Sequence, residues 1–223
     1  MIIVGIDEVG RGPLAGPITV CAFACQIDVY AKLKHRKDLP SKGVDSKKLS
    51  PKAREHHAQI LCSLSNLNYV KDAPWHSVSR GILDIRRGGF GYVVVHVSNK
   101  VIDRRGISFA TNKAISKAIG KLKLNPSKCK ILLDGGLKAP KEFKNQKTII
   151  KGDEKEKIIA WASILAKVSR DRIMTGQAKK FPSYGFELHK GYGTLAHRQA
   201  IETYGFSIIH RQSFCEHVSR RRS

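Results

Sequence analysis

The chain has 223 residues, of which 41% are hydrophobic, so it is long and apolar enough for one well-buried domain and is not a disordered protein. Forty-one lysines and arginines against 18 acids leave a formal net charge of +23, which indicates an anionic partner, nucleic acid before a membrane surface. No apolar run reaches the roughly 18 residues of a membrane span, and the five cysteines include no C-x-x-C pair. We therefore expect a cytoplasmic protein with reduced, mostly buried thiols and no membrane partner.

The first predicted elements are two short strands and a helix. Met1–Ile6 and Ile18–Cys25 are apolar and bounded by glycine and proline, and the second is apolar on both alternations, as in a strand covered on both faces. Tyr30–Lys48 is basic and is expected to be a loop. Ser50, followed by proline, has the features of a helix N-cap, and apolar residues at helical spacing extend that helix to about Leu64.

Strands and helices continue to alternate through the middle of the chain, which favours a mixed α/β domain. Tyr92–Val97 is a β-branched strand, and Ser108 is expected to cap a helix that ends near Leu122. Lys130–Leu133 and Thr148–Ile150 are two further short strands.

A long helix is predicted from about Glu154 to Ala178, and Phe181-Pro182 ends it. Its expected buried stripe consists of Ile158, Trp161, Ala162, Leu165 and Val168. Residues 183–223 are rich in glycine, histidine, aromatic residues and arginine, and we expect a small helical appendage with a disordered basic tail. The domain prediction is therefore a catalytic unit over 1–182 and an appendage over 183–223.

Four acids stand at or just beyond the predicted strand ends, namely Asp7, Glu8, Asp134 and Asp153. If these strand ends meet at one edge of the sheet, the carboxylates repel one another unless a cation neutralises them. Oxygen ligands without histidine or cysteine suit Mg²⁺ or Mn²⁺, and a two-metal site of this kind cleaves phosphodiesters. Taken singly, Asp134 is equally well explained as a turn residue before Gly135-Gly136, and Asp153 as a helix N-cap.

Six blocks along nearly the whole chain resemble the ribonuclease HII family, the type 2 ribonucleases H. In chain order they are G-I-D-E-V-G-R-G-P-L-A-G-P at Gly5–Pro17, V-D-S-K-K-L at Val44–Leu49, Ile102–Thr111, L-L-D-G at Leu132–Gly135, Lys151–Asp153 with Ala162–Asp171, and Tyr184–Phe186 with His189–Thr194 and Ile209–Phe214. The chain departs from the family pattern at Arg104–Ile107 and at Trp161, and His76–Gly91 does not align with it. The resemblance implies a ribonuclease H-like mixed sheet flanked by helices.

The resemblance also implies roles for particular residues. The family's four metal-binding and catalytic carboxylates correspond to Asp7, Glu8, Asp134 and Asp153. The substrate-binding positions correspond to Gly10, Arg11 and Gly12 at the ribonucleotide and its 2′-hydroxyl, to Tyr192 at the ribo–deoxy junction, and to Lys47, Ser163 and Lys167 as candidate phosphate contacts. An ordinary half-buried tyrosine is the alternative for Tyr192, and solvated or structural roles are the alternatives for the last three.

The implied function is metal-dependent endonucleolytic cleavage of the RNA strand of RNA–DNA hybrids and of single ribonucleotides in duplex DNA, with 5′-phosphate and 3′-hydroxyl products. A monomer is expected, with a clamp-type protein partner at the C-terminal tail as an option. Two alternatives remain at this point. A non-catalytic basic protein that coats nucleic acid explains the charge but leaves the strand-end acids without a role, and a nuclease of the same fold could require long hybrid tracts.

Overall fold

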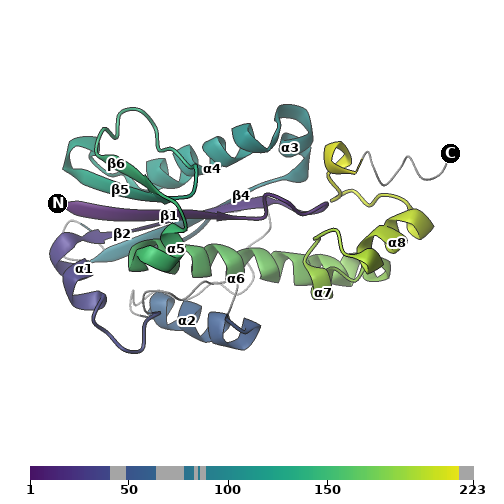
Figure 1. Cartoon of the computed structure of the whole chain (residues 1–223), viewed down its shortest axis with the longest axis horizontal. Coiled ribbons are helices and arrows are strands. Elements are labelled where there is room, and N and C mark those ends of the chain that lie inside the picture. Colours follow the sequence, from purple (N-terminus) through teal and green to yellow (C-terminus); the bar gives the residue numbers. More distant parts are fainter. Residues whose placement is uncertain (41–48, 64–77, 83–84, 86–88, 216–223) are drawn as a thin grey trace.

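A six-stranded mixed sheet in the order β3-β4-β2-β1-β5-β6 runs through the middle of the protein (Figure 1). The computed structural model describes residues 1–40, 49–63, 78–82, 85 and 89–215. The strands are β1 Ile2–Val9, β2 Ile18–Gln26, β3 Val78–Ile82, β4 Phe90–Val97, β5 Cys129–Asp134 and β6 Gln146–Ile149. β2 lies in the interior of the sheet and is buried along all but its last residue, so the predicted two-sided burial is confirmed.

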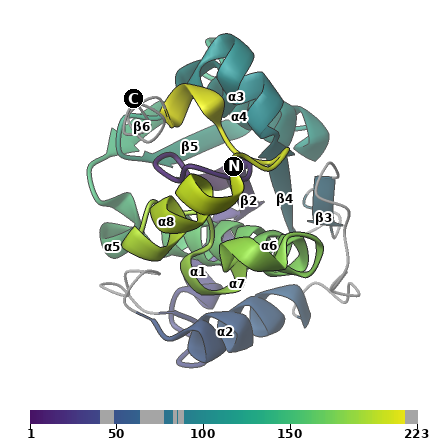
Figure 2. The same ribbon diagram turned by 90° about the vertical axis from the view of Figure 1, so that its right-hand side faces the viewer.

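Helices cover both faces of this sheet, as the end-on view in Figure 2 shows. They are α1 Ile27–Leu33, α2 Pro51–Ser63, α3 Asn99–Arg105, α4 Ile107–Leu122, α5 Gly152–Lys155, α6 Lys157–Lys180, α7 Phe186–His189 and α8 Leu195–Tyr204. One apolar cluster joins the sheet to α4, and a second joins the opposite face to α2 and α6. The α/β class and the mixed sheet flanked by helices are thereby confirmed.

The direction of the strands decides where the acids meet. β1 pairs with β5 in parallel, and β5 pairs with β6 in parallel, so these three strands end at the same edge of the sheet. β1 also pairs antiparallel with β2, and this pairing continues to Val9 opposite Thr19. The strand therefore does not end at Ile6 as predicted. It continues to Val9, so Asp7 and Glu8 belong to β1 and not to the loop that follows it.

Two predicted helices begin differently in the structure. The helix expected to be capped by Ser108 starts at Ile107, and Gly106 takes the cap position with a φ of 80°. The long helix expected from Glu154 is broken at Glu156, whose extended backbone separates α5 from α6. The five residues of its predicted stripe are all buried, and Phe181 ends it as expected.

Three elements escaped prediction. α1 occupies the start of the segment expected to be a loop, while 41–48 lie outside the described residues. α3 directly precedes α4, and β3 adds an edge strand beside β4. By contrast, α2 begins at Pro51 as predicted, and the Ser50 hydroxyl accepts the N–H of Ala53 over 3.2 Å.

The C-terminal segment packs against the end of α6 through a third apolar cluster. Its buried members are Ala15, Met174, Ala178, Tyr184, Phe186, Ile201 and Ile209. Ala15 belongs to the β1–β2 loop, here residues 10–17, so this loop is fixed between α6 and the C-terminal helices. The division at residue 182 stays a prediction, and the basic tail lies outside the described residues.

The five cysteines are buried and free, as expected. Across the described ranges, no helix combines the length and apolar character that a membrane crossing requires.

Candidate active site

Three carboxylates cluster at the edge of the sheet where β1 and β5 end. Asp7 and Glu8 come from β1, and Asp134 is the last residue of β5. The parallel register pairs Ile6 with Leu133, so Asp7 and Asp134 follow at the same level of the sheet. One carboxylate oxygen from each of the three acids lies within 4.8 Å of the other two. We call Asp7, Glu8 and Asp134 the acidic cluster.

The acidic cluster concentrates like charge in a buried place. Asp7 is only 5% exposed. Its burial raises the pKa of its carboxyl well above the usual value, the neighbouring Glu8 and then Asp134 raise it further, and a hydrogen bond from the Ser163 hydroxyl lowers it. Such a set of hard oxygen ligands fits a divalent cation, whose charge would relieve the repulsion.

Backbone N–H groups hold two of these carboxylates in place. The N–H of Glu8 donates to Asp7 Oδ1 over 2.7 Å, and the N–H of Gly152 donates to Asp134 Oδ1 over 2.6 Å. The second contact ties the start of α5 to the end of β5. The turn reading of Asp134 therefore holds alongside its place in the cluster, because its carbonyl also accepts the N–H of Leu137 over 3.2 Å.

Asp153 stands apart from the acidic cluster. It lies within α5 and is buried, and its Oδ1 accepts the N–H of Glu154 over 3.0 Å. Lys151 occupies the cap position of α5, so the N-cap alternative for Asp153 is wrong. Among the described residues, the group of acids close enough to share an ion does not include Asp153. Its role as a fourth metal ligand stays a prediction.

The acidic cluster opens into a pocket of about 210 Å³, here the acidic pocket. The pocket collects nine of the eleven predicted site residues and Val9, whereas Asp153 does not line it and Lys47 lies outside the described residues. The nine are Asp7, Glu8, Gly10, Arg11, Gly12, Asp134, Ser163, Lys167 and Tyr192. Residues far apart in the sequence thus line one small space, which carries both acidic and basic side chains.

Tyr192 also lines the acidic pocket. Its side chain is half-exposed, and two cations lie near its ring, with Lys167 Nζ 5.8 Å and Arg170 Cζ 5.7 Å from the ring centre. The Tyr192 carbonyl oxygen lies 2.9 Å from His197 Nδ1. One ring face backed by cations suits stacking on a nucleotide.

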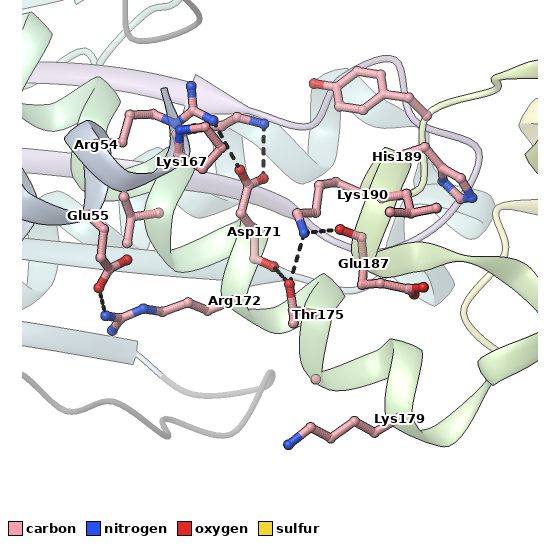
Figure 3. Close-up of a pocket in the computed structure, with 15 residues that line it drawn as sticks. Arg54, Glu55, Lys167, Asp171, Arg172, Thr175, Lys179, Glu187, His189 and Lys190 are labelled. Carbon is pink, nitrogen blue, oxygen red and sulfur yellow. Dashed lines mark hydrogen bonds and ion pairs between the residues drawn. The ribbon is translucent and has the colours of Figure 1, made fainter. Parts of the chain in front are cut away.

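A second, larger groove of about 730 Å³ adjoins the acidic pocket and shares Lys167 and Tyr192 with it. Figure 3 shows that several of its charged side chains pair with one another. Lys167 bonds Asp171 over 2.9 Å, Arg54 lies 3.9 Å from the same carboxylate, and Arg172 pairs with Glu55. Lys167 is therefore neutralised in part by a partner on its own helix.

Two arginines for which the sequence predicted no role contact the β1–β2 loop from the protein interior. Arg170 and Arg211 are both completely buried. Each stands inside a block that carries the family resemblance, but five of the six carbonyls that they contact are 153 to 201 positions away, so spacing gives no signal for them. A charged residue in an otherwise buried stretch of α6 was the one available hint.

Comparison with known proteins agrees with this site. The family model described as ribonuclease HII matches residues 4–217. A curated ribonuclease HII of Clostridium beijerinckii is 40% identical over 212 residues, which cover 95% of this chain and 67% of the relative. The ribonuclease H2 structure from Pyrococcus horikoshii matches with a TM-score of 0.69 and 26% identity, over 99% of this chain and 98% of that one.

A structure of the PCNA:RNase HII complex from Archaeoglobus fulgidus has the same fold, with a TM-score of 0.60 and 23% identity over 95% of this chain and 94% of that one. The match to the family model spans almost the entire sequence. The chain therefore belongs to the ribonuclease HII family and is a type 2 ribonuclease H, an endonuclease that acts on RNA–DNA hybrids.

Proposed function

We propose that this ribonuclease H cleaves both the RNA strand of hybrids and single ribonucleotides embedded in duplex DNA, and leaves 5′-phosphate and 3′-hydroxyl ends. One observation carries the proposal: the acidic cluster, the Gly10–Gly12 stretch and Tyr192 line a single pocket. These groups surround one space of about 210 Å³, so they can act together on a single nucleotide. Recognition of one ribose in this pocket would suffice for cleavage.

Asp7, Glu8 and Asp134 would hold Mg²⁺ or Mn²⁺, and Asp153 is the proposed fourth ligand. The fit rests on the all-oxygen donor set and on the mutual repulsion of the buried acids. When bound, such ions supply Lewis acidity to the scissile phosphate and lower the pKa of water.

The remaining roles belong to the protein's own groups. The Tyr192 ring stacks on the sugar or base beside the scissile phosphate, and backbone groups of Gly10–Gly12 contact the ribose. Arg11, which is exposed and lies 3.8 Å from Glu8 in the free protein, contacts a phosphate once substrate competes for it. Lys47, Ser163 and Lys167 are proposed phosphate contacts. Because Ser163 also bonds Asp7, it would link substrate position to the acidic cluster.

The proposed setting is a cytoplasmic monomer with a clamp-type partner at the C-terminal tail. The partner is suggested by the Archaeoglobus fulgidus complex named above, and it concerns residues outside the described ranges.

A cleavage assay on matched substrates tests the function. Three duplexes of one sequence carry no ribonucleotide, one ribonucleotide, or a long RNA tract, and each is incubated with Mg²⁺, Mn²⁺ or chelator. We expect nicking of the second and third duplexes in either metal, and no nicking in chelator. Removal of the new 5′-phosphate by phosphatase and extension of the new 3′-end by a polymerase identify the product ends. Cleavage of the long tract alone would overturn the single-ribonucleotide proposal.

A further inference from the structure

The β1–β2 loop is held by two buried guanidinium groups. Arg170 and Arg211 are 0% exposed. Within the described part of the chain, no carboxylate lies within ion-pair distance of either group. Burial lowers the pKa of Arg211 to about 9, whereas Asp103 favours the charge of Arg211 and Asp171 that of Arg170 from a longer distance. A buried cation without a counter-ion is costly unless hydrogen bonds satisfy it fully, so its placement needs a reason.

Six backbone carbonyls satisfy the two groups. Arg211 donates from Nε to Gly16 O over 2.9 Å, from Nη1 to Arg11 O over 3.0 Å, and from Nη2 to Gly10 O over 2.7 Å. Five of the six carbonyls belong to the β1–β2 loop, and they arrive from both of its arms. The loop is therefore shaped by side chains from α6 and from the C-terminal segment rather than by its own turn bonds.

Arg170 joins the loop to the segment that carries Tyr192. It donates from Nε to Pro17 O over 3.0 Å, from Nη2 to Ala15 O over 3.1 Å, and from Nη1 to Lys190 O over 3.0 Å. The last carbonyl lies two residues before Tyr192, whose ring also faces Arg170. Arg170 thus joins the two sides of the acidic pocket, together with the backbone bonds from the N–H groups of Leu14 and Ala15 to the Gly191 carbonyl.

The carbonyl contacts also decide where the N–H groups of the loop point. In a trans peptide the C=O and the N–H lie on opposite sides of one plane, and the chain has no cis bond among its described residues. Arg211 holds the carbonyls of Gly10 and Arg11, so the N–H groups of Arg11 and Gly12 face away from it. No acceptor among the described residues takes either N–H.

The two glycines of the stretch differ in what a side chain would meet. A Cβ on Gly10 would lie 2.3 Å from Arg170 Nε, and φ there is +94°. A Cβ on Gly12 would meet nothing within 4 Å. Gly10 is therefore required by the packed arginine, whereas the bare backbone of Gly12 leaves open space on the pocket side.

We propose that Arg170 and Arg211 are positioning residues for ribonucleotide recognition, and that they aim the N–H groups of Arg11 and Gly12 into the acidic pocket. The N–H pair is the donor set for the 2′-hydroxyl oxygen of the bound ribose, the group that all-DNA duplex lacks. Arg170 acts with the backbone bonds to Gly191 to set the spacing between this pair and Tyr192. The inference rests on the proposed single-ribonucleotide activity and adds to it the residues that enforce discrimination from outside the pocket.

Arg211→Lys tests the proposal, because lysine keeps the charge but cannot span three carbonyls. Dissociation constants are measured by fluorescence anisotropy with Ca²⁺, for a duplex with one ribonucleotide and for its all-DNA counterpart. We expect the preference for the ribonucleotide duplex to fall about tenfold, the effect of one misplaced hydrogen-bond set. Affinity for all-DNA duplex should stay within about twofold of wild type.

Leu122→Ala is the matched control. Leu122 is buried at the end of α4 on the opposite face of the sheet, so its truncation lowers the melting temperature without touching the loop. We expect this variant to keep the wild-type preference. An Arg211→Lys protein that loses stability like the control but keeps full preference would overturn the proposal.

A measurement on wild type keeps the proposal testable even if the variant does not fold. With ¹⁵N-labelled arginine and glycine, the amide signals of Arg11 and Gly12 should shift more on binding the ribonucleotide duplex than on binding all-DNA duplex. Equal shifts for both duplexes would refute the aimed N–H groups. If wild type fails to nick a ribonucleotide duplex at all, the proposed function is wrong, which is a separate result.

Discussion

The acidic cluster and the arginine pair, Arg170 and Arg211, both place charge inside the protein, but they stabilise it in different ways. In the cluster, Asp7, Glu8 and Asp134 stand within ligand distance of one another and raise the pKa of Asp7. In the arginine pair, each guanidinium nitrogen of Arg170 and Arg211 donates to a neutral backbone carbonyl. The acidic cluster needs a bound cation to neutralise its charge, whereas the arginine pair takes its hydrogen-bond acceptors from the protein itself.

This difference separates chemistry from support. Repulsion among the carboxylates of the acidic cluster raises their affinity for a cation, because a bound cation relieves that repulsion. Arg170 and Arg211 are fully buried, and each of their guanidinium nitrogens donates to a backbone carbonyl, so they hold the backbone and are not exposed to a ligand. Variants of the acidic cluster should therefore lose cleavage, whereas variants that disturb the arginine pair should lose stability or ribonucleotide preference.

Neutralising one acid should have the largest effect. Asp7→Asn and Asp134→Asn each remove charge that a cation requires, so we expect single-turnover cleavage to fall by about a thousandfold or more. Because repulsion is relieved, the melting temperature without metal should be unchanged or higher. Wild type should gain stability on addition of Mn²⁺, by ligand linkage, and the variants should gain less.

The exposed Glu142, far along the chain on the loop after β5, supplies the control for these variants. Glu142→Gln also removes one negative charge but should leave both cleavage and the Mn²⁺ effect unchanged. Near-normal cleavage by Asp7→Asn would contradict the assignment of the acidic cluster.

The two glycines should divide stability from recognition. Gly10→Ala places a methyl group against Arg170 at a positive φ, so it should lower the unfolding free energy by about 1–3 kcal/mol. Gly12→Ala has open space around it and should change stability by less than about 0.5 kcal/mol, yet weaken ribonucleotide preference by narrowing the pocket. Thermal melting measures the loss of stability, and the anisotropy assay measures the loss of ribonucleotide preference. Equal losses of stability and of preference in both variants would contradict the different roles of Gly10 and Gly12.

The histidines behind Tyr192 should give the smallest effect, seen only in acid. His197 Nε2 and His210 Nε2 lie 3.0 Å apart, while the N–H of Ser207 donates to His210 Nδ1. His210 must then donate to His197, and both rings are neutral. Burial lowers the pKa of His197 and of His210 to about 4.

The sign of the pH effect follows from these values. Between pH 6.5 and about 4 the unfolded chain binds protons that the folded rings refuse, so stability should fall as pH falls through this window. His197→Asn keeps an N–H donor for the Tyr192 carbonyl but cannot titrate. Its melting temperature should fall less steeply with acid than that of wild type, whereas the exposed His56→Asn should follow wild type. Identical slopes for all three would refute the histidine contribution.

The acidic cluster could be predicted from sequence because its cause is local. A carboxylate at the end of an apolar strand is visible in one window, and parallel pairing then places Asp7 beside Asp134. Asp153 looked equivalent but lies in the short helix α5, and Glu156, whose extended backbone separates α5 from α6, is not a helix-breaking residue type. α1 and α3 were also missed, because each has only seven residues and lies directly beside a longer element.

The support behind the pocket could not be predicted, because its contacts have no local signature. Arg170 and Arg211 donate to carbonyls, which every residue possesses, so no complementary residue type marks the partner. The histidine cluster likewise consists of His189, His197 and His210, whose rings meet only because the fold brings their segments together. The family blocks contained these residues except His197 but gave no roles for them.

The contact between Arg211 and Gly10 joins positions that are 201 residues apart. During synthesis, the β1–β2 loop is made 201 residues before the guanidinium group that supports it. A nascent chain can therefore build the sheet and gather its acids before the loop acquires its final shape. Ribonucleotide selection should appear only after Arg211 has left the ribosome, so that a shorter nascent chain carries metal ligands but cannot yet select a ribonucleotide.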